Sequence, residues 1–184
     1  FLGQISEKVF HFSPFAGNMI EGLIRLGAVI GYIWLVGKIP EIARVFAYHG
    51  AEHKTINAFE DNAELTPASV MRYSLEHPRC GTAFLLTLVV FSVIIFTLLG
   101  PLPTLVRLLS RIVLLPAIAG LAYEYIRFTA NYIDHPIVRI LIKPNLALQH
   151  LTTREPDQGM VEVAIAAFNK MREEELVNQP QPAS

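Results

Sequence analysis

Cysteine is almost absent from the sequence: Cys80 stands alone, and one thiol cannot form an internal disulfide framework. Charged residues are also scarce, at 17% against about 25% in ordinary soluble domains. Because the net charge is only −1, no basic field favours nucleic acid, and we expect no nucleic-acid partner. The first residues show no secretory signal, and Phe1 in place of Met indicates an incomplete or processed N-terminus.

Apolar residues make up 52% of the sequence and are concentrated in three long runs. Residues 82–99 contain no charge and approach the roughly 20 residues that cross a bilayer as a helix. Residues 20–39 and 105–126 are two further membrane-helix candidates, although Arg25 in the first must reach an interface or face protein. We therefore predict an all-α membrane protein with about three membrane helices and the lipid bilayer as its partner.

Gly27 and Gly31 form a GxxxG pair in the first run, a spacing that lets two helices approach closely. Such glycines also occur in membrane helices without pairing. Two interpretations therefore stand: a contact surface for other membrane subunits, or no contact at all.

The segments around these runs are polar or amphipathic, and the length favours a single membrane domain over residues 1–184. We interpret them as an interfacial lead-in (1–19), a polar loop (41–81), surface helices (127–177) and a solvated tail (178–184). From Met160 to Leu176 apolar residues recur at helical spacing, which predicts an amphipathic helix capped by Asp157.

Positive charges are unevenly distributed between these segments. The 41–81 loop and the segment after residue 126 are richer in arginine and lysine than the 100–111 turn. The positive-inside rule then places the polar loop and the C-terminal region in the cytoplasm.

The stretch YHGAEHK, residues 48–54, raises the question of a metal site. On a helix, His49 and His53 share a face, and two imidazoles suit a divalent ion such as zinc. The order H-x-x-E-H is the inverted zinc-protease motif, in which Glu52 acts as general base for a metal-bound water. The alternative is a polar helix end that faces water or lipid headgroups. A haem or chlorophyll site is disfavoured because Glu52 and Lys54 make this face polar.

Catalytic zinc usually has three protein ligands and one open position, so a third ligand is needed. Glu124 is the first candidate, because an ionisable group in an apolar helix needs a partner. A local ion pair with Arg127 is the alternative for Glu124. His77 and Cys80, in HPRCG, are a second candidate pair, or else they belong to a loop that begins the next helix.

Four blocks of the sequence resemble the YqhQ-like family, mostly bacterial multi-pass membrane proteins that are predicted metal-dependent enzymes. The blocks are YHGAEHKTINAFE (48–60), HPRCGTAFLL (77–86), LPAIAGLAYEYIR (115–127) and LTTREPD (151–157). The resemblance implies a multi-pass protein of the bacterial cytoplasmic (inner) membrane. A glycine-rich N-terminal region that it also implies is missing from the sequence. The residues that match the family's motifs are His49, Glu52, His53, His77, Arg79, Cys80, Glu124, Arg154 and Glu155.

LTTREPD can also be interpreted from its residues alone. Thr152 with Glu155 resembles a capping box, and Pro156 then suits a helix start. Arg154 is a candidate to bind a carboxylate or the phosphate of a headgroup.

Two functions of different classes follow from these observations. The first is a metal-dependent hydrolase at the membrane face, acting on an ester, amide or phosphoester. Its metal ligands would be His49, His53 and Glu124. Its catalytic residues would be Glu52, which moves the proton, and Arg79 and Arg154, which stabilise the developing anion. The second is a non-enzymatic membrane subunit or assembly factor, in which a metal or a hydrogen-bond network fixes the polar loop.

Overall fold

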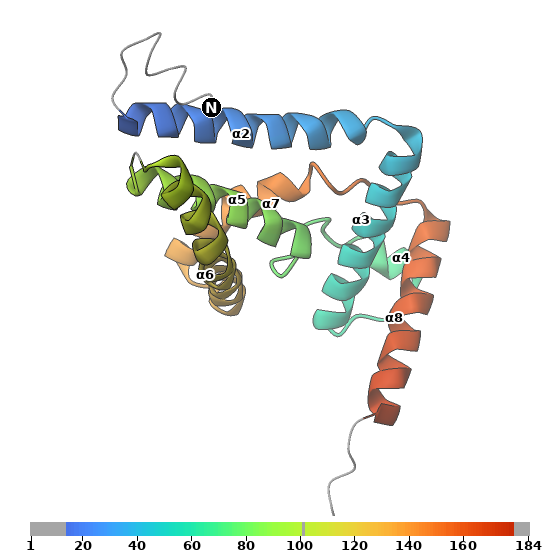
Figure 1. Ribbon diagram of the computed structural model, residues 1–184. Helices are drawn as coiled ribbons and strands as arrows, with labels where there is room; N and C mark the ends of the chain where they lie inside the picture. The colour runs from blue at the N-terminus through green and yellow to red at the C-terminus, as the bar shows by residue number, and fades with distance from the viewer. Residues whose placement is uncertain (1–13, 101, 179–184) are drawn as a thin grey trace, which may run out of the picture. The chain divides into compact units, whose positions relative to one another are not determined.

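Every secondary-structure element in the described part of the chain is a helix (Figure 1). The computed structural model describes residues 14–100 and 102–178. The helices in these ranges are α2 (Pro14–Val36), α3 (Pro40–Glu60), α4 (Pro67–Val70), α5 (Gly81–Leu98), α6 (Thr104–Asn131), α7 (Pro136–Gln149) and α8 (Gln158–Asn178). The predicted all-α class is confirmed.

The chain forms two compact units, each with its own core. The apolar unit comprises the described part of Phe1–Leu35 together with Pro78–Leu148, and the histidine unit comprises Val36–His77 with the described part of Gln149–Ser184. The sequence favoured one membrane domain. Chain length alone does not indicate that two polar segments far apart in the sequence form a separate unit.

Among the described residues, three helices are long and apolar enough to cross a membrane: α5, α6 and the Met19–Val36 part of α2. The buried share is only 6% for this part of α2, 22% for α5 and 11% for α6. Such extensive exposure of apolar side chains is unusual for a surface in water. The three predicted runs are thus helices, with ends that differ from the prediction by up to six residues.

The apolar unit shows why its helices begin and end where they do. No charged residue interrupts α5, and Gly100 follows it with φ 69°, the left-handed conformation that ends many helices. In α2, a Cβ placed on Gly27 or Gly31 would meet no atom within 4 Å among the described residues. The predicted lead-in lies mostly outside the described residues, and its last part, from Pro14, is helical.

The histidine unit is built from α3, α4 and α8, and Figure 1 shows α3 and α8 running side by side. Its core holds Ala51 and Ala58 of α3, Val70 of α4 and Val161 of α8, each with no exposed surface. The small alanines allow a close approach of the two long helices. Much of the 41–81 segment, described from the sequence as a loop, is therefore helical.

The start of α8 agrees with the sequence. The Oδ1 atom of Asp157 accepts a hydrogen bond from the backbone N–H of Met160 at 2.8 Å, which is the predicted cap. The predicted capping box is wrong, because no helix begins at Thr152: α7 ends at Gln149 and α8 begins at Gln158. The hydroxyls of Thr152 and Thr153 donate to the carbonyl of Gln149, at 3.2 and 2.9 Å.

Candidate metal site

The two histidines of the H-x-x-E-H motif lie next to each other on α3. The ring centroids of His49 and His53 are 4.3 Å apart, with the rings at 69°. A ring nitrogen of each lies within 4.8 Å of one from the other. The side chain of His53 is buried and that of His49 is half-buried. The helical spacing therefore brings both imidazoles to one face, as predicted.

Each of these rings is held by a backbone carbonyl. The Nδ1 atom of His49 lies 2.9 Å from the oxygen of Thr152, and the Nδ1 atom of His53 lies 2.5 Å from the oxygen of Leu75. A carbonyl only accepts, so Nδ1 carries the hydrogen and donates it. In a neutral imidazole the lone pair is then on Nε2, and this is the usual arrangement of a metal-binding histidine.

Lys54, the residue after His53, is a buried cation that ties α3 to the next segment. Its side chain is only 5% exposed, and Nζ donates to the carbonyls of Met71 at 2.9 Å and Tyr73 at 2.8 Å. Nζ also lies 2.7 Å from Oε1 of Glu155, which is largely exposed. The sequence did not indicate this role, because nothing in the spacing shows which carbonyls a lysine will meet.

Asn57 extends the same pattern by one turn. Its Nδ2 donates to the carbonyls of Ser74 at 3.0 Å and Glu76 at 2.9 Å. Together with Lys54 and His53, it holds the chain from Met71 to Glu76 against α3 through main-chain oxygens. The carbonyl that orients the ring of His53 is therefore fixed by its neighbours.

Gly50 allows the segment that carries the carbonyl of Thr152, the partner of His49, to lie close to α3. A Cβ at this position would overlap the carbonyl oxygen of Arg154 and would lie 2.8 Å from Cδ2 of Leu75. The backbone N–H of Arg154 donates to the oxygen of Phe46 at 2.9 Å. The absence of a side chain thus lets the segment that carries Thr152 lie directly against α3.

Arg154 makes local contacts within this segment. Its Nη1 donates to the carbonyls of His150 at 2.8 Å and Thr153 at 3.0 Å, and its guanidinium lies 5.9 Å from the ring centroid of Phe46. These contacts hold the segment together. The sequence suggested that Arg154 binds an anion, whereas its contacts here are with carbonyl groups and an aromatic ring of the protein.

His77 is, after His53, a second buried histidine among the described residues of the unit. Its ring centroid is 5.8 Å from that of His53, and its Nε2 is 3.6 Å from Oε2 of Glu60. The side chain of Gln149 fixes its backbone, accepting from the N–H at 2.9 Å and donating to the carbonyl at 2.8 Å. His77 is therefore a candidate donor within the same unit.

Glu52 directly precedes His53 on α3 but does not share its burial. It is exposed and lines a groove of about 620 Å³ between α3 and α8. The walls of the groove are mostly apolar, including Ile56, Phe59 and Phe168. Glu52 is thus open to solvent and to a ligand in this groove.

The remaining predicted residues belong to the apolar unit. Glu124 is exposed on α6, and its Oε1 lies 3.9 Å from Nη1 of Arg127, the local pair that the sequence offered as an alternative. Arg79 lines a cavity of about 340 Å³ together with Cys80, a buried cysteine whose Sγ lies 3.0 Å from Oγ1 of Thr82. Among the predicted site residues, the structure brings His49, Glu52, His53, His77 and Arg154 into one unit.

Comparisons with known proteins identify a family and a relative of this chain. A family described as "Protein of unknown function (DUF1385)" matches residues 1–174. The chain is 38% identical over 185 residues to a Bacillus subtilis (strain 168) protein described as "Uncharacterized protein YqhQ". The match covers 100% of this chain and 58% of the relative, so the chain spans little more than half the relative's length. No solved structure matches it.

Proposed function

The chain belongs to the DUF1385 family, as its YqhQ-like blocks predicted, and we propose that it is a membrane-bound protein that holds a divalent metal ion with His49 and His53. The observation that carries this proposal is the bond from each Nδ1 to a backbone carbonyl, which presents Nε2 as the ligand atom. A polar helix end in water would not need two rings held in the same tautomer by two distant segments.

Membrane insertion is supported by the three apolar helices and by their exposed side chains. Leu98, Leu105, Ile112 and Val113 are all at least 62% exposed, which suits contact with lipid tails. We propose a multi-pass protein of the bacterial cytoplasmic membrane, with residues 41–81 and the C-terminal region in the cytoplasm. Carbonate washing should leave the protein in the membrane pellet, and release of the bulk of it would contradict insertion.

Zinc is the proposed ion, because imidazole is one of its preferred ligands. Two histidines leave the coordination incomplete. Three residues stand as candidates for the third ligand: Glu124, His77 and Cys80. Measuring the metal content of single variants at these three positions distinguishes them, because removing a ligand lowers affinity.

The proposed activity is hydrolysis of an ester, amide or phosphoester. A bound zinc ion would supply a water molecule acidified to near neutral pH and a charge that polarises the scissile group. The exposed carboxylate of Glu52 would accept the proton of that water and pass it to the leaving group. The guanidinium groups of Arg79 and Arg154 are the candidates to stabilise the developing anion. Support for this activity comes from the exposure of Glu52 in a groove large enough for a substrate.

A second candidate function is a non-enzymatic helical subunit or assembly factor. It is favoured by the way that His49, His53, Lys54 and Asn57 all bind main-chain carbonyls. Such a network fixes a surface without any chemistry. In this case the metal completes the network, and all of its coordination positions are filled by the protein.

The test is elemental analysis of protein purified in detergent without a chelator. We expect stoichiometric zinc in the wild type, its loss in His49→Ala and His53→Ala, and its retention in His135→Ala, a histidine of the apolar unit. Glu52→Gln should keep the metal and abolish activity against ester, amide and phosphodiester substrates. Activity that is unchanged in Glu52→Gln would overturn the hydrolase. Wild-type protein without metal would overturn the site.

A further inference from the structure

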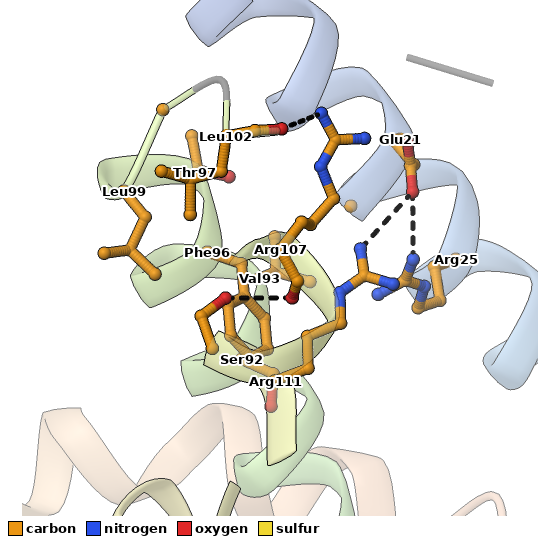
Figure 2. Close-up of a pocket in the computed structure, with 13 residues that line it drawn as sticks. Glu21, Arg25, Ser92, Val93, Phe96, Thr97, Leu99, Leu102, Arg107 and Arg111 are labelled. Carbon is orange, nitrogen blue, oxygen red and sulfur yellow. Dashed lines mark hydrogen bonds and ion pairs between the residues drawn. The ribbon is translucent and has the colours of Figure 1, made fainter. Parts of the chain in front are cut away.

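A small pocket in the apolar unit, formed where α2, α5 and α6 meet, gathers positive charge (Figure 2). It is lined by Glu21 and Arg25 of α2, Thr97 of α5, and Arg107 and Arg111 of α6. Its volume is about 40 Å³. None of these residues takes part in the histidine unit or in the function proposed above.

Among the described residues that line this pocket, the positive and negative charges do not balance. Oε1 of Glu21 lies 3.0 Å from Nη2 of Arg25 and 3.9 Å from Nη2 of Arg111, so one carboxylate faces two guanidinium groups (Figure 2). Arg107 donates to the carbonyl of Leu102 at 3.1 Å and brings a third positive charge. With every group ionised, three arginines and one glutamate leave two positive charges, and these favour an anion.

Two buried donors at the pocket have no hydrogen-bond partner among the described residues: Nε of Arg111 and Oγ1 of Thr97. The side chain of Thr97 is almost fully buried, with 2% of its surface exposed. Buried polar groups in folded proteins are nearly always satisfied, because an unpaired donor loses its bond to water and gains nothing. Both atoms are therefore available to an acceptor that enters the pocket.

We propose that this pocket binds the phosphate group of a monoester, a diester or inorganic phosphate. Phosphate oxygens act as acceptors toward arginine and a threonine hydroxyl, and arginine suits their geometry. A water molecule needs about 10–15 Å³ by this measure of volume, so the pocket holds about three waters, the size of one phosphate group. The pocket lies beside the turn between α5 and α6, where lipid headgroups meet helices that cross a membrane. An anionic phospholipid and free phosphate are the two possible sources.

The test follows the thermal unfolding of the full chain in a neutral detergent at constant ionic strength, without added metal. The probes are inorganic phosphate and dihexanoyl phosphatidic acid. We expect a saturable rise in the melting temperature of the wild type, lost in Arg111→Gln and Thr97→Val. Arg139→Gln, which removes an exposed arginine of α7 outside the pocket, should respond like the wild type. Phosphatidic acid that saturates at a lower concentration identifies a lipid source, and the reverse order identifies free phosphate.

Thr97→Val separates binding from folding. It replaces an unpaired hydroxyl with a methyl of similar shape, so without a probe its melting temperature should equal or exceed that of the wild type. A lower melting temperature without a probe would show that the hydroxyl has a partner within the protein and would overturn the proposal. So would a wild type that responds to neither probe, or an Arg139→Gln variant that loses the response. Carbonate extraction of each variant shows separately whether insertion is preserved, and the metal content of the wild type is independent of all these results.

Discussion

Replacing Gly50 by alanine sets two effects of opposite sign against each other. In an exposed helix interior, glycine to alanine stabilises by about 1 kcal/mol, because alanine restricts the unfolded chain. At Gly50 the new Cβ would overlap the carbonyl oxygen of Arg154 and would crowd Leu75. The segment cannot easily move away, because the N–H of Arg154 is bonded to the oxygen of Phe46.

The expected magnitude follows from this geometry. Overpacking costs about 1–3 kcal/mol, and a collision with backbone rather than with a flexible side chain belongs at the upper end. After subtracting the gain in helix propensity, we expect Gly50→Ala to destabilise the contact by about 2 kcal/mol. Because 1.4 kcal/mol is a factor of ten, backbone amides of residues 152–154 should exchange with solvent about 30-fold faster.

Hydrogen exchange with mass spectrometry measures this effect locally. Gly120→Ala in α6 is the matched control, because a Cβ there meets no atom within 4 Å among the described residues. The control should leave exchange at 152–154 unchanged. The displaced carbonyl of Thr152 should also weaken metal binding through His49. Exchange in Gly50→Ala that is equal to or slower than in the wild type would refute the close contact.

Three further predictions concern other contacts. Lys54→Met removes the donor to the carbonyls of Met71 and Tyr73. We therefore expect faster hydrogen exchange of the backbone amides of residues 71–77 and weaker zinc binding. Unchanged hydrogen exchange would show that the buried ammonium does not hold this segment. Glu124→Gln should lower zinc content if Glu124 is a ligand, and normal zinc content in this variant would leave its contact with Arg127 as its role. The hydrogen bond to Asp61 raises the pKa of the Tyr73 phenol above its ordinary value of 10.0. The stability that this hydrogen bond contributes is therefore fully present below about pH 10, and it is lost as the pH rises through the higher pKa of the folded state. Tyr73→Phe should remove that alkaline loss of stability in a pH series of thermal melts, and a loss identical to that of the wild type would contradict the assignment.

Patterns along the chain predicted the helices well, because apolar length and periodicity depend only on local residues. The charge-free run that became α5, the cap at Asp157 and the shared face of His49 and His53 are all of this kind. The partners of these side chains could not be predicted in the same way. The carbonyls of Leu75 and Thr152 have no sequence signature, since every residue carries one.

The same limit applies to Gly50 and Lys54, whose roles depend on distant backbone. A glycine in a helix has several possible causes, and only the approach of Arg154 distinguishes them. A lysine beside two histidines is usually a solvated charge, whereas here the side chain of Lys54 is buried and donates to the carbonyls of Met71 and Tyr73. The division into two units also depends on long-range packing between α3 and α8, which lie far apart in the sequence.

The most direct test of the proposed metal site is X-ray absorption at the zinc edge of the purified wild-type protein. We expect a stoichiometric zinc signal with at least two imidazole nitrogens at about 2.0–2.1 Å, and fewer imidazoles around the residual zinc of His53→Ala. Zinc surrounded by oxygen alone, or no zinc signal in protein prepared without a chelator, would contradict it.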